Sequence, residues 1–325
     1  MKKQKDLRAG GGIRGLLGVL GAFVLLFVIL AVLPQTSSSF LQVTNLSNVV
    51  RQITVNIILA CGLTMAILIG GIDLSVGSVV AISGCLTAGL MTNNGLPVGL
   101  AVVIGLLSGV AFGAFNGLFI SSTNIPPFIV TLATMNIGRG IVRLYTNSRT
   151  ILVSDSVFNF MGRGMIFDVI PVQLVYIVFF CAIAWFVLNR TKTGRHMYAV
   201  GDNEQAALYT GINVRRVKFA VYVFAGFFAA VAGIIAAART SSGLYTTGEG
   251  YEMDAIAAVV LGGTSMTGGV GRLSGSIIGA MIIGILDNGM NILGLNSSWQ
   301  YVVKGAVLLI AVLIDYVKKR REGSE

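Results

Sequence analysis

Residues 53–92 read ITVNIILACGLTMAILIGGIDLSVGSVVAISGCLTAGLMT, two apolar runs on either side of a glycine-rich break. Asp73, in the break, is the one charged residue of this stretch. A helix that crosses a bilayer needs roughly 20 mostly apolar residues. Each run is close to that length, so the stretch predicts two spanning helices with only a few residues between them.

The same composition extends over the whole chain of 325 residues, which is 55% hydrophobic and 11% charged. An ordinary soluble domain carries roughly 25% charged residues. The chain also contains 42 glycines, and glycine is common in closely packed transmembrane helices. The composition therefore excludes a soluble enzyme, a nucleic-acid-binding domain and a disordered chain.

Ten apolar runs are candidate spanning helices, and the eighth of them is short. They lie near residues 15–33, 53–71, 75–92, 97–120, 126–145, 170–188, 217–238, 252–263, 274–293 and 299–317. The sequence therefore predicts an all-α polytopic membrane protein of about ten transmembrane helices. Its expected parts are a basic tail at 1–14, one transmembrane domain at 15–317 with a loop at 189–216, and a basic tail at 318–325.

The formal net charge of +10 comes largely from basic residues in those two tails and in the loop at 189–216. Lys and Arg next to apolar segments collect on the cytoplasmic side of a membrane. We therefore expect a multi-pass protein of the cell (inner) membrane with both termini in the cytoplasm. The loops 34–52, 146–169, 239–251 and 294–298 are then expected outside, and the charge indicates a lipid bilayer, not nucleic acid, as the partner.

A second glycine-rich break, LGGTSMTGGVGR at 261–272, matches the one at 70–78. Paired interruptions of this kind are typical of transporters built from internally repeated halves, and two ordinary glycine-rich turns are the alternative. Four glycines at a spacing of four residues form one helix face, which would let a neighbouring helix approach closely. They are Gly105, Gly109, Gly113 and Gly117.

The motifs of common enzymes are missing from the sequence. No GxxxxGK[ST] segment is present to hold nucleotide phosphates, and the single histidine, His196, lies in the loop at 189–216. We therefore expect no catalytic residue, no metal site and no cofactor bound by this chain, and an intramembrane enzyme is a remote alternative. Cys61, Cys85 and Cys181 all fall within apolar runs, where packing is their expected role.

A few polar residues interrupt the apolar runs, and such residues are costly unless they face the bundle interior or a watery path. The candidates for a translocation pathway are Asp73, Ser75, Asn116, Asn288 and Asn291, and Asp287 and Lys304 also lie at membrane depth. Amides and hydroxyls suit a neutral polyol better than an ion. The alternative is structural: asparagines can join helices by hydrogen bonds, and Asp73 can cap a helix.

The loop at 189–216 contains the pattern of a short exposed helix. Asp202 is a candidate N-cap, Glu204 falls in the first turn, and Gly211 is a candidate for the left-handed residue after the helix. A surface helix with small residues and defined ends can fit a groove on another protein. A simple connecting helix is the alternative.

Within this loop, Glu204-x-Ala206-Ala207-x-x-x-Gly211 resembles the E-A-A…G coupling segment of ABC-importer permeases. The segments GGIDLSVGS at 70–78, IPPFIVTL at 125–132 and GYEMDAIAAVVLGGTS at 250–265 are similar to the ribose-type monosaccharide permeases of the branched-chain amino-acid/ribose permease superfamily. Together these motifs extend from about residue 45 to the C-terminus.

The resemblance implies a homodimeric permease that imports ribose or a related sugar. Its implied partners are a second copy of the chain, a cytoplasmic ABC ATPase that binds the ATP, and an extracytoplasmic sugar-binding protein. The residues implied in ATPase coupling are Gly201, Asp202, Asn203, Glu204, Ala206, Ala207, Gly211 and Ile212. A branched-chain amino-acid ABC permease and an autonomous secondary sugar transporter are the alternatives.

Several arginines in the expected outer loop at 146–169 and in the span before it violate the positive-inside trend. Arg–carboxylate pairs give orientation as well as attraction, so we interpret these arginines as docking residues for the binding protein. The candidates are Arg143, Arg149, Arg163 and, from the next outer loop, Glu249. For Arg143, which lies at a span end, contact with lipid headgroups is an equal alternative.

Overall fold

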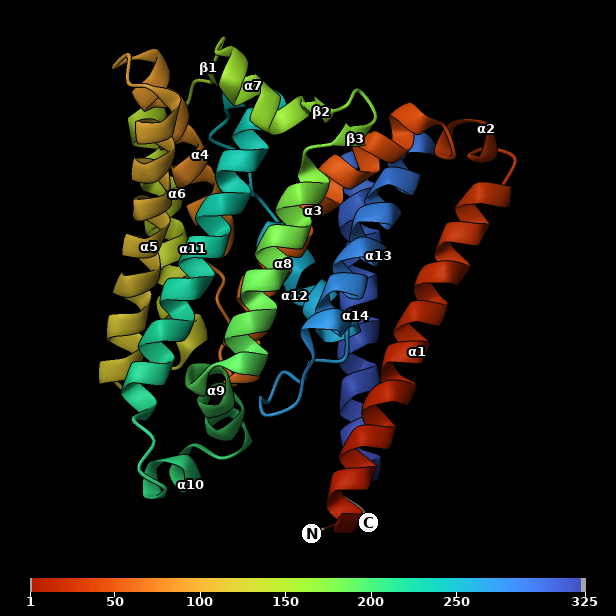
Figure 1. The fold of residues 1–325 in the computed structure, drawn as a ribbon, viewed down its shortest axis with the longest axis vertical. Helices are drawn as coiled ribbons and strands as arrows, with labels where there is room; N and C mark the ends of the chain where they lie inside the picture. Colours follow the sequence, from red (N-terminus) through yellow and green to blue (C-terminus); the bar gives the residue numbers. More distant parts are fainter. Residues whose placement is uncertain (1, 323–325) are drawn as a thin grey trace.

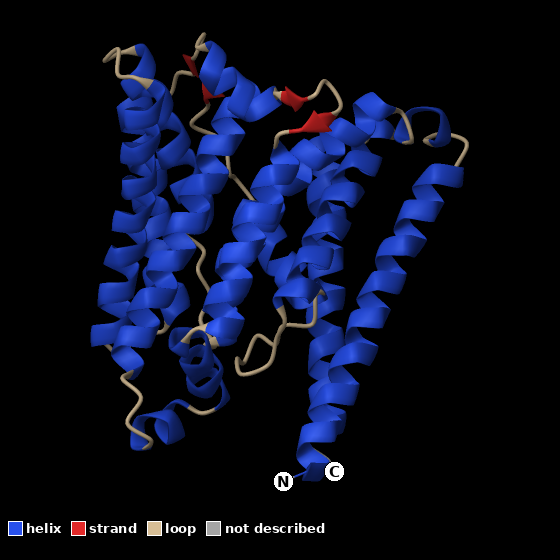
Figure 2. Ribbon diagram, in the orientation of Figure 1, coloured by secondary structure: helices blue, strands red, loops and turns tan. Residues whose placement is uncertain are grey.

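The computed structural model describes residues 2–322, which form fourteen helices and four two-residue strands (Figures 1 and 2). The helices are α1 (Lys2–Val32), α2 (Ser37–Phe40), α3 (Val43–Leu68), α4 (Val76–Thr92), α5 (Val98–Ser122), α6 (Pro127–Thr146), α7 (Ser156–Arg163), α8 (Gln173–Arg190), α9 (Lys192–Asp202), α10 (Glu204–Tyr209), α11 (Val214–Thr240), α12 (Tyr251–Leu261), α13 (Leu273–Ile292) and α14 (Ser297–Glu322). The strands are β1 (Ile151–Leu152), β2 (Met165–Ile166), β3 (Ile170–Pro171) and β4 (Ser242–Gly243). The all-α fold is confirmed.

Each of the ten predicted spans coincides with a helix, namely α1, α3, α4, α5, α6, α8, α11, α12, α13 and α14. Among the described residues, α3, α5, α8, α11 and α13 are long and apolar enough to cross a membrane by themselves. The eighth span, α12, is short as expected, with 11 residues. The chain is therefore a polytopic membrane protein.

The long helices run back and forth between two ends of the molecule (Figure 1). The described ends of α1 and α14 lie at the same end as α9 and α10, which we call the terminal end. The opposite end, which we call the strand end, carries α2, α7 and the two small antiparallel pairs β1–β4 and β2–β3. This arrangement places the described ends of α1 and α14 and the loop at 189–216 on one side, as the charge pattern predicts.

The order of the helices fits the predicted internal repeat. The four helices α3–α6 and the four helices α11–α14 each run back and forth in succession, but α3 starts at the strand end and α11 at the terminal end (Figure 1). The two sets therefore run in opposite directions, which is the relation found in inverted-repeat transporters.

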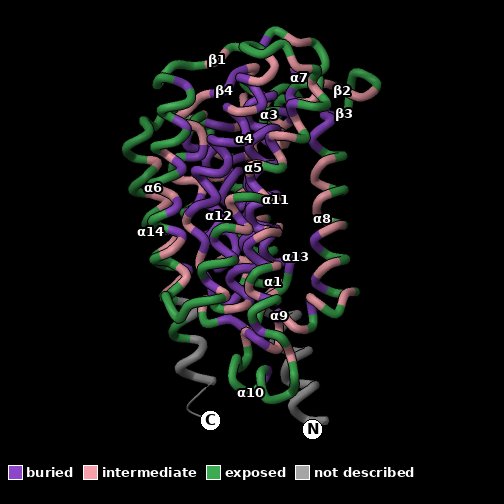
Figure 3. Tube along the Cα trace, turned by 90° about the vertical axis from the view of Figure 1, so that its left-hand side faces the viewer, coloured by how far each residue is buried: buried purple, intermediate pink, exposed green. Residues whose placement is uncertain are grey.

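Burial differs strongly among the helices. Most of α3 and α11 is buried, whereas most residues of α5 and α8 are half-buried or exposed (Figure 3). Large apolar side chains such as Leu107 and Val178 account for much of the exposed surface of α5 and α8. An apolar exposed surface of this extent is suited to lipid or to another membrane subunit.

The glycine face of α5 packs directly on α11. A Cβ atom on Gly113 would overlap the Tyr222 carbonyl oxygen, and one on Gly117 would lie 2.9 Å from the Phe219 carbonyl oxygen. Only glycine permits such a close approach of two backbones. The packing role predicted for this glycine face is confirmed.

The topology gives a direct labelling prediction. Single cysteines at Asp155 and Thr246, near the strand end, are expected to react with a membrane-impermeant maleimide added outside intact cells. A cysteine at the exposed Gln205, at the terminal end, is expected to react only after the membrane is opened. The three native cysteines are replaced for this experiment, and labelling of residue 205 in intact cells would contradict the map.

Candidate functional site

The segment formed by α9 and α10 lies at the terminal end of the bundle, and α10 projects from it (Figure 1). The Asn203 side chain caps α10, because its Oδ1 accepts a hydrogen bond from the Ala206 N–H at 2.9 Å. The prediction that Asp202 is the cap was therefore wrong by one residue, since Asp202 ends α9. Glu204 lies in the first turn as predicted, and Gly211 has the expected positive φ of 83°.

The two faces of α10 have different environments. Ala207 is 4% exposed and belongs to the main hydrophobic core, so it cannot contact another protein directly. Leu208 and Tyr209, in contrast, are 54% and 86% exposed. This pair was not predicted from the sequence, although two apolar residues directly follow the Ala206-Ala207 motif.

An ion pair fixes α10 to the following helix. Lys218 Nζ of α11 lies 2.7 Å from Glu204 Oε1. Ile212 N–H also donates to the Ala207 carbonyl oxygen at 3.1 Å, which closes the turn after α10. A displacement of α10 would therefore be transmitted to α11.

A second connection, which we call the glycine junction, joins α9 to both glycine-rich breaks. It comprises Leu68, Tyr198, Gly201, Gly269 and Gly271. The Gly269 N–H donates to the Leu68 carbonyl oxygen at 2.9 Å, and the Tyr198 hydroxyl donates to the Gly271 carbonyl oxygen at 3.1 Å. Gly201 lies so close that a Cβ atom would overlap the Leu68 carbonyl oxygen.

Tyr198 lies on α9, outside the spanning helices. Burial raises the pKa of its hydroxyl, and the nearby Arg272 charge opposes that shift. The hydroxyl therefore stays protonated and keeps its bond to the Gly271 carbonyl. A Cβ atom on Gly268 would lie 2.8 Å from the Gly70 nitrogen and 2.9 Å from the Gly201 carbonyl oxygen. The two breaks, which are distant in sequence, thus meet each other and α9 at one place.

The break at 69–75 ends in a buried polar network. Asp73 Oδ1 accepts hydrogen bonds from the Ser75 N–H at 2.9 Å and from the Ser75 hydroxyl at 2.6 Å. Asn116 of α5 donates from Nδ2 to Ser75 Oγ at 2.8 Å. All three are almost fully buried, so three of the five candidate pathway residues form one cluster.

The other two candidates lie near the strand end. Asn288 of α13 exchanges two amide hydrogen bonds with Asn45 of α3, at 2.9 and 3.1 Å. Asn291 Oδ1 accepts a hydrogen bond from Gln300 Nε2 at 2.8 Å. The five candidates therefore form separate groups at opposite ends of the bundle, and the Asn288–Asn45 pair joins two helices, as the structural alternative predicted.

The candidate docking residues lie at the strand end, but two of the arginines have partners within the chain. Arg143 Nη2 lies 3.7 Å from Glu249 Oε1. Arg163 Nε donates to the Arg239 carbonyl oxygen at 2.6 Å, at the end of α11. Arg149 is exposed, so it is the best placed of the three to meet a second protein.

These features describe a multi-span membrane protein in which an exposed segment is joined to a buried polar break, the organisation of a transport permease. The chain belongs to the family described as branched-chain amino acid transport system / permease component, whose sequence profile matches residues 45–312.

Curated relatives cover nearly the whole chain. The ribose import permease protein RbsC of Bacillus subtilis (strain 168) is 46% identical over 94% of both chains. RbsC of Escherichia coli (strain K12) is 43% identical over 92% of this chain and 94% of its own. The D-allose transport system permease protein AlsC of the same strain is 37% identical over 91% and 90%. These matches confirm the resemblance to ribose-type permeases, and no solved structure matches the chain.

Proposed function

We propose that this chain is the permease subunit of an ATP-driven importer for ribose or a closely related monosaccharide. The observation that carries this proposal is its 46% identity, over 94% of both chains, to a ribose import permease. The family description favours the branched-chain amino-acid permease as the second candidate.

The proposed partners occupy opposite ends of the bundle. A second copy of the chain completes the pathway, and a cytoplasmic ABC ATPase, which binds the ATP, receives α10 with its exposed Leu208 and Tyr209. A sugar-binding protein docks at the strand end, where Arg149 is exposed. Motion of α10 then passes through the Glu204–Lys218 ion pair to α11, and through Gly201 to the two breaks.

Transport by the assembled system tests this proposal. The chain is expressed with a cytoplasmic ABC ATPase and a ribose-binding protein, in cells that lack their own ribose uptake. Accumulation of labelled ribose is expected, together with its loss when the ATPase carries an inactivating change in its phosphate-binding loop. Uptake of leucine in place of ribose would establish the amino-acid permease, and uptake without an active ATPase would establish a secondary transporter.

Tyr209 provides a prediction about coupling. Tyr209→Asp is expected to lower sugar uptake at least fivefold, because it puts a charge on the apolar surface that would enter the ATPase groove. Tyr209→Phe, which keeps the ring, is the matched control and is expected to stay within twofold of wild type. The measurement is sugar uptake per amount of membrane-inserted protein. Uptake by Tyr209→Asp equal to that of wild type would show that α10 is only a connecting helix.

A further inference from the structure

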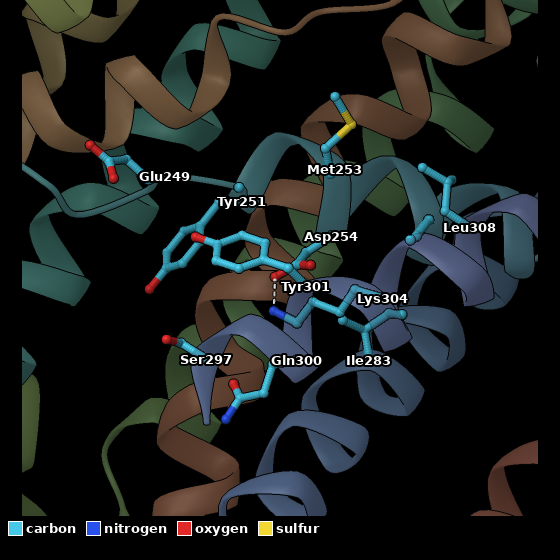
Figure 4. A pocket seen from close by; sticks show the side chains of 13 residues that line it. Glu249, Tyr251, Met253, Asp254, Ile283, Ser297, Gln300, Tyr301, Lys304 and Leu308 are labelled. Carbon is cyan, nitrogen blue, oxygen red and sulfur yellow. Dashed lines mark hydrogen bonds and ion pairs between the residues drawn. The ribbon is translucent and has the colours of Figure 1, made fainter. Parts of the chain in front are cut away.

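A pocket of about 330 Å³ lies between α12 and α14, with α13 behind it (Figure 4). Two tyrosines, Tyr251 and Tyr301, add aromatic rings to the polar lining, which comes from Glu249, Asp254, Ser297, Gln300 and Lys304. Tyr251 and Ser297 begin α12 and α14, and α14 starts at the strand end, whereas α12 starts within the bundle (Figure 1). The volume lies at the lower end of the range of small-molecule pockets, which is roughly 300–1,000 Å³.

An ion-pair cluster forms one wall of this pocket. Lys304 Nζ lies 2.7 Å from Asp254 Oδ2 and 3.0 Å from Asp287 Oδ1. Both carboxylates are almost fully buried, whereas the Lys304 side chain is 24% exposed and Asp254 also faces the pocket. Charged groups at the opening of a pocket are costly against lipid tails, so this face of the chain opens to water or to protein.

We propose that this pocket is a transit site in which a monosaccharide is held by the Asp254–Lys304 pair and the two tyrosine rings. The choice of solute rests on the proposed function, while the location rests on the pocket itself. A sugar hydroxyl can donate to the Asp254 carboxylate and accept from the Lys304 ammonium at the same time. The C–H face of a sugar ring can pack on an aromatic ring of Tyr251 or Tyr301.

The position and the chemistry of the pocket suit the brief passage of a sugar better than tight binding. The pocket lies toward the strand end, where the binding protein is proposed to release its sugar. Without a sugar, the two charges satisfy each other, so the empty site needs no rearrangement. Tyr301 is 62% exposed, which leaves the bound solute partly open and therefore free to leave, as conduction requires.

Gly305 allows the pocket to be filled without breaking its ion pairs. It lines the pocket, and a Cβ atom added there would meet no atom within 4 Å. Gly140 of α6 is the matched control: its Cβ position is equally open, and it lies a similar number of residues from the strand-end terminus of its helix. Gly305→Trp and Gly140→Trp therefore place the same bulk on two different faces.

The experiment measures sugar uptake into proteoliposomes that contain the permease and the ATPase, at saturating sugar-loaded binding protein. Gly305→Trp is expected to lower uptake at least tenfold while the size of the assembled complex is unchanged, and Gly140→Trp to stay within twofold of wild type. Tyr301→Ala is expected to lower uptake at least threefold, and Tyr301→Phe, which keeps the ring, to lower it less than Tyr301→Ala. Normal uptake by Gly305→Trp would overturn the proposal.

Two further outcomes would also decide between the proposals. Loss of complex assembly by Gly305→Trp would overturn the transit site and identify this face as a contact between subunits. Absence of sugar uptake by the wild-type complex would refute the proposed function instead. Uptake of the solute that the wild-type complex does transport, for example a zwitterionic amino acid, is then compared between Gly305→Trp and Gly140→Trp. Loss of that uptake by Gly305→Trp alone would support the pocket as a transit site for that solute in place of a monosaccharide.

Discussion

Gly201→Val is expected to abolish sugar uptake, to below one twentieth of wild type. The added Cβ atom would overlap the Leu68 carbonyl oxygen and lie 2.5 Å from the Gly269 nitrogen, and backbone atoms of a helix end cannot move aside singly. The glycine junction would open, and α9 would lose its contact with both breaks. Overpacking of this kind costs about 1–3 kcal/mol of folding free energy, less than is needed to unfold a typical domain.

Uptake and thermal unfolding of the purified protein are measured together. Gly99→Val serves as control, since a Cβ atom at Gly99 would meet no atom within 4 Å, and it should leave both properties unchanged. Gly201→Ala places the same Cβ atom without further bulk, so it should fall between wild type and Gly201→Val. Normal uptake by Gly201→Val would show that the junction does not transmit motion.

Asp73→Ala is expected to lower both stability and transport. The change leaves the Ser75 N–H and hydroxyl without the acceptor that they have now, and Ser75 is almost fully buried. An unsatisfied buried polar group costs about 1–3 kcal/mol, so we expect a decrease of that size in the free energy of unfolding. Uptake is expected to fall at least tenfold, because the network fixes the start of α4 against α5.

Asp73→Asn is the matched variant, because an amide keeps an oxygen where the two hydrogen bonds end. It should unfold within about 1 kcal/mol of wild type, since one neutral hydrogen bond contributes about that much. Unfolding is followed by denaturant titration in detergent and uptake in cells. Wild-type stability of Asp73→Ala would mean that Ser75 and Asn116 find other partners.

The sequence was sufficient for features that are set locally. Membrane spans follow from runs of apolar residues, and all ten runs coincide with helices. The glycine face of α5 and the left-handed Gly211 also follow from spacing within one segment. Each of these features depends on residues that are close in sequence, so the sequence of one segment is enough to predict it.

Contacts between distant segments could not be predicted in this way. Nothing near Gly201 indicates that it meets Leu68, and nothing near Asn288 indicates its pairing with Asn45. The burial of Ala207 was missed for a similar reason: in a helix as short as α10, the inward face is set by tertiary contacts such as the Glu204–Lys218 pair. The pocket beside Lys304 likewise needs three helices that are brought together only by the fold.

The close packing of α5 on α11 has a consequence for biosynthesis. Residues 123–213 lie between the two helices, so the ribosome has finished α5 and several later segments before α11 is made. Until α11 is made, the part of the α5 glycine face at Gly113 and Gly117, which packs on Tyr222 and Phe219, lacks its partner. A nascent chain that stops before α11 therefore carries an unfilled groove beside Gly113 and Gly117.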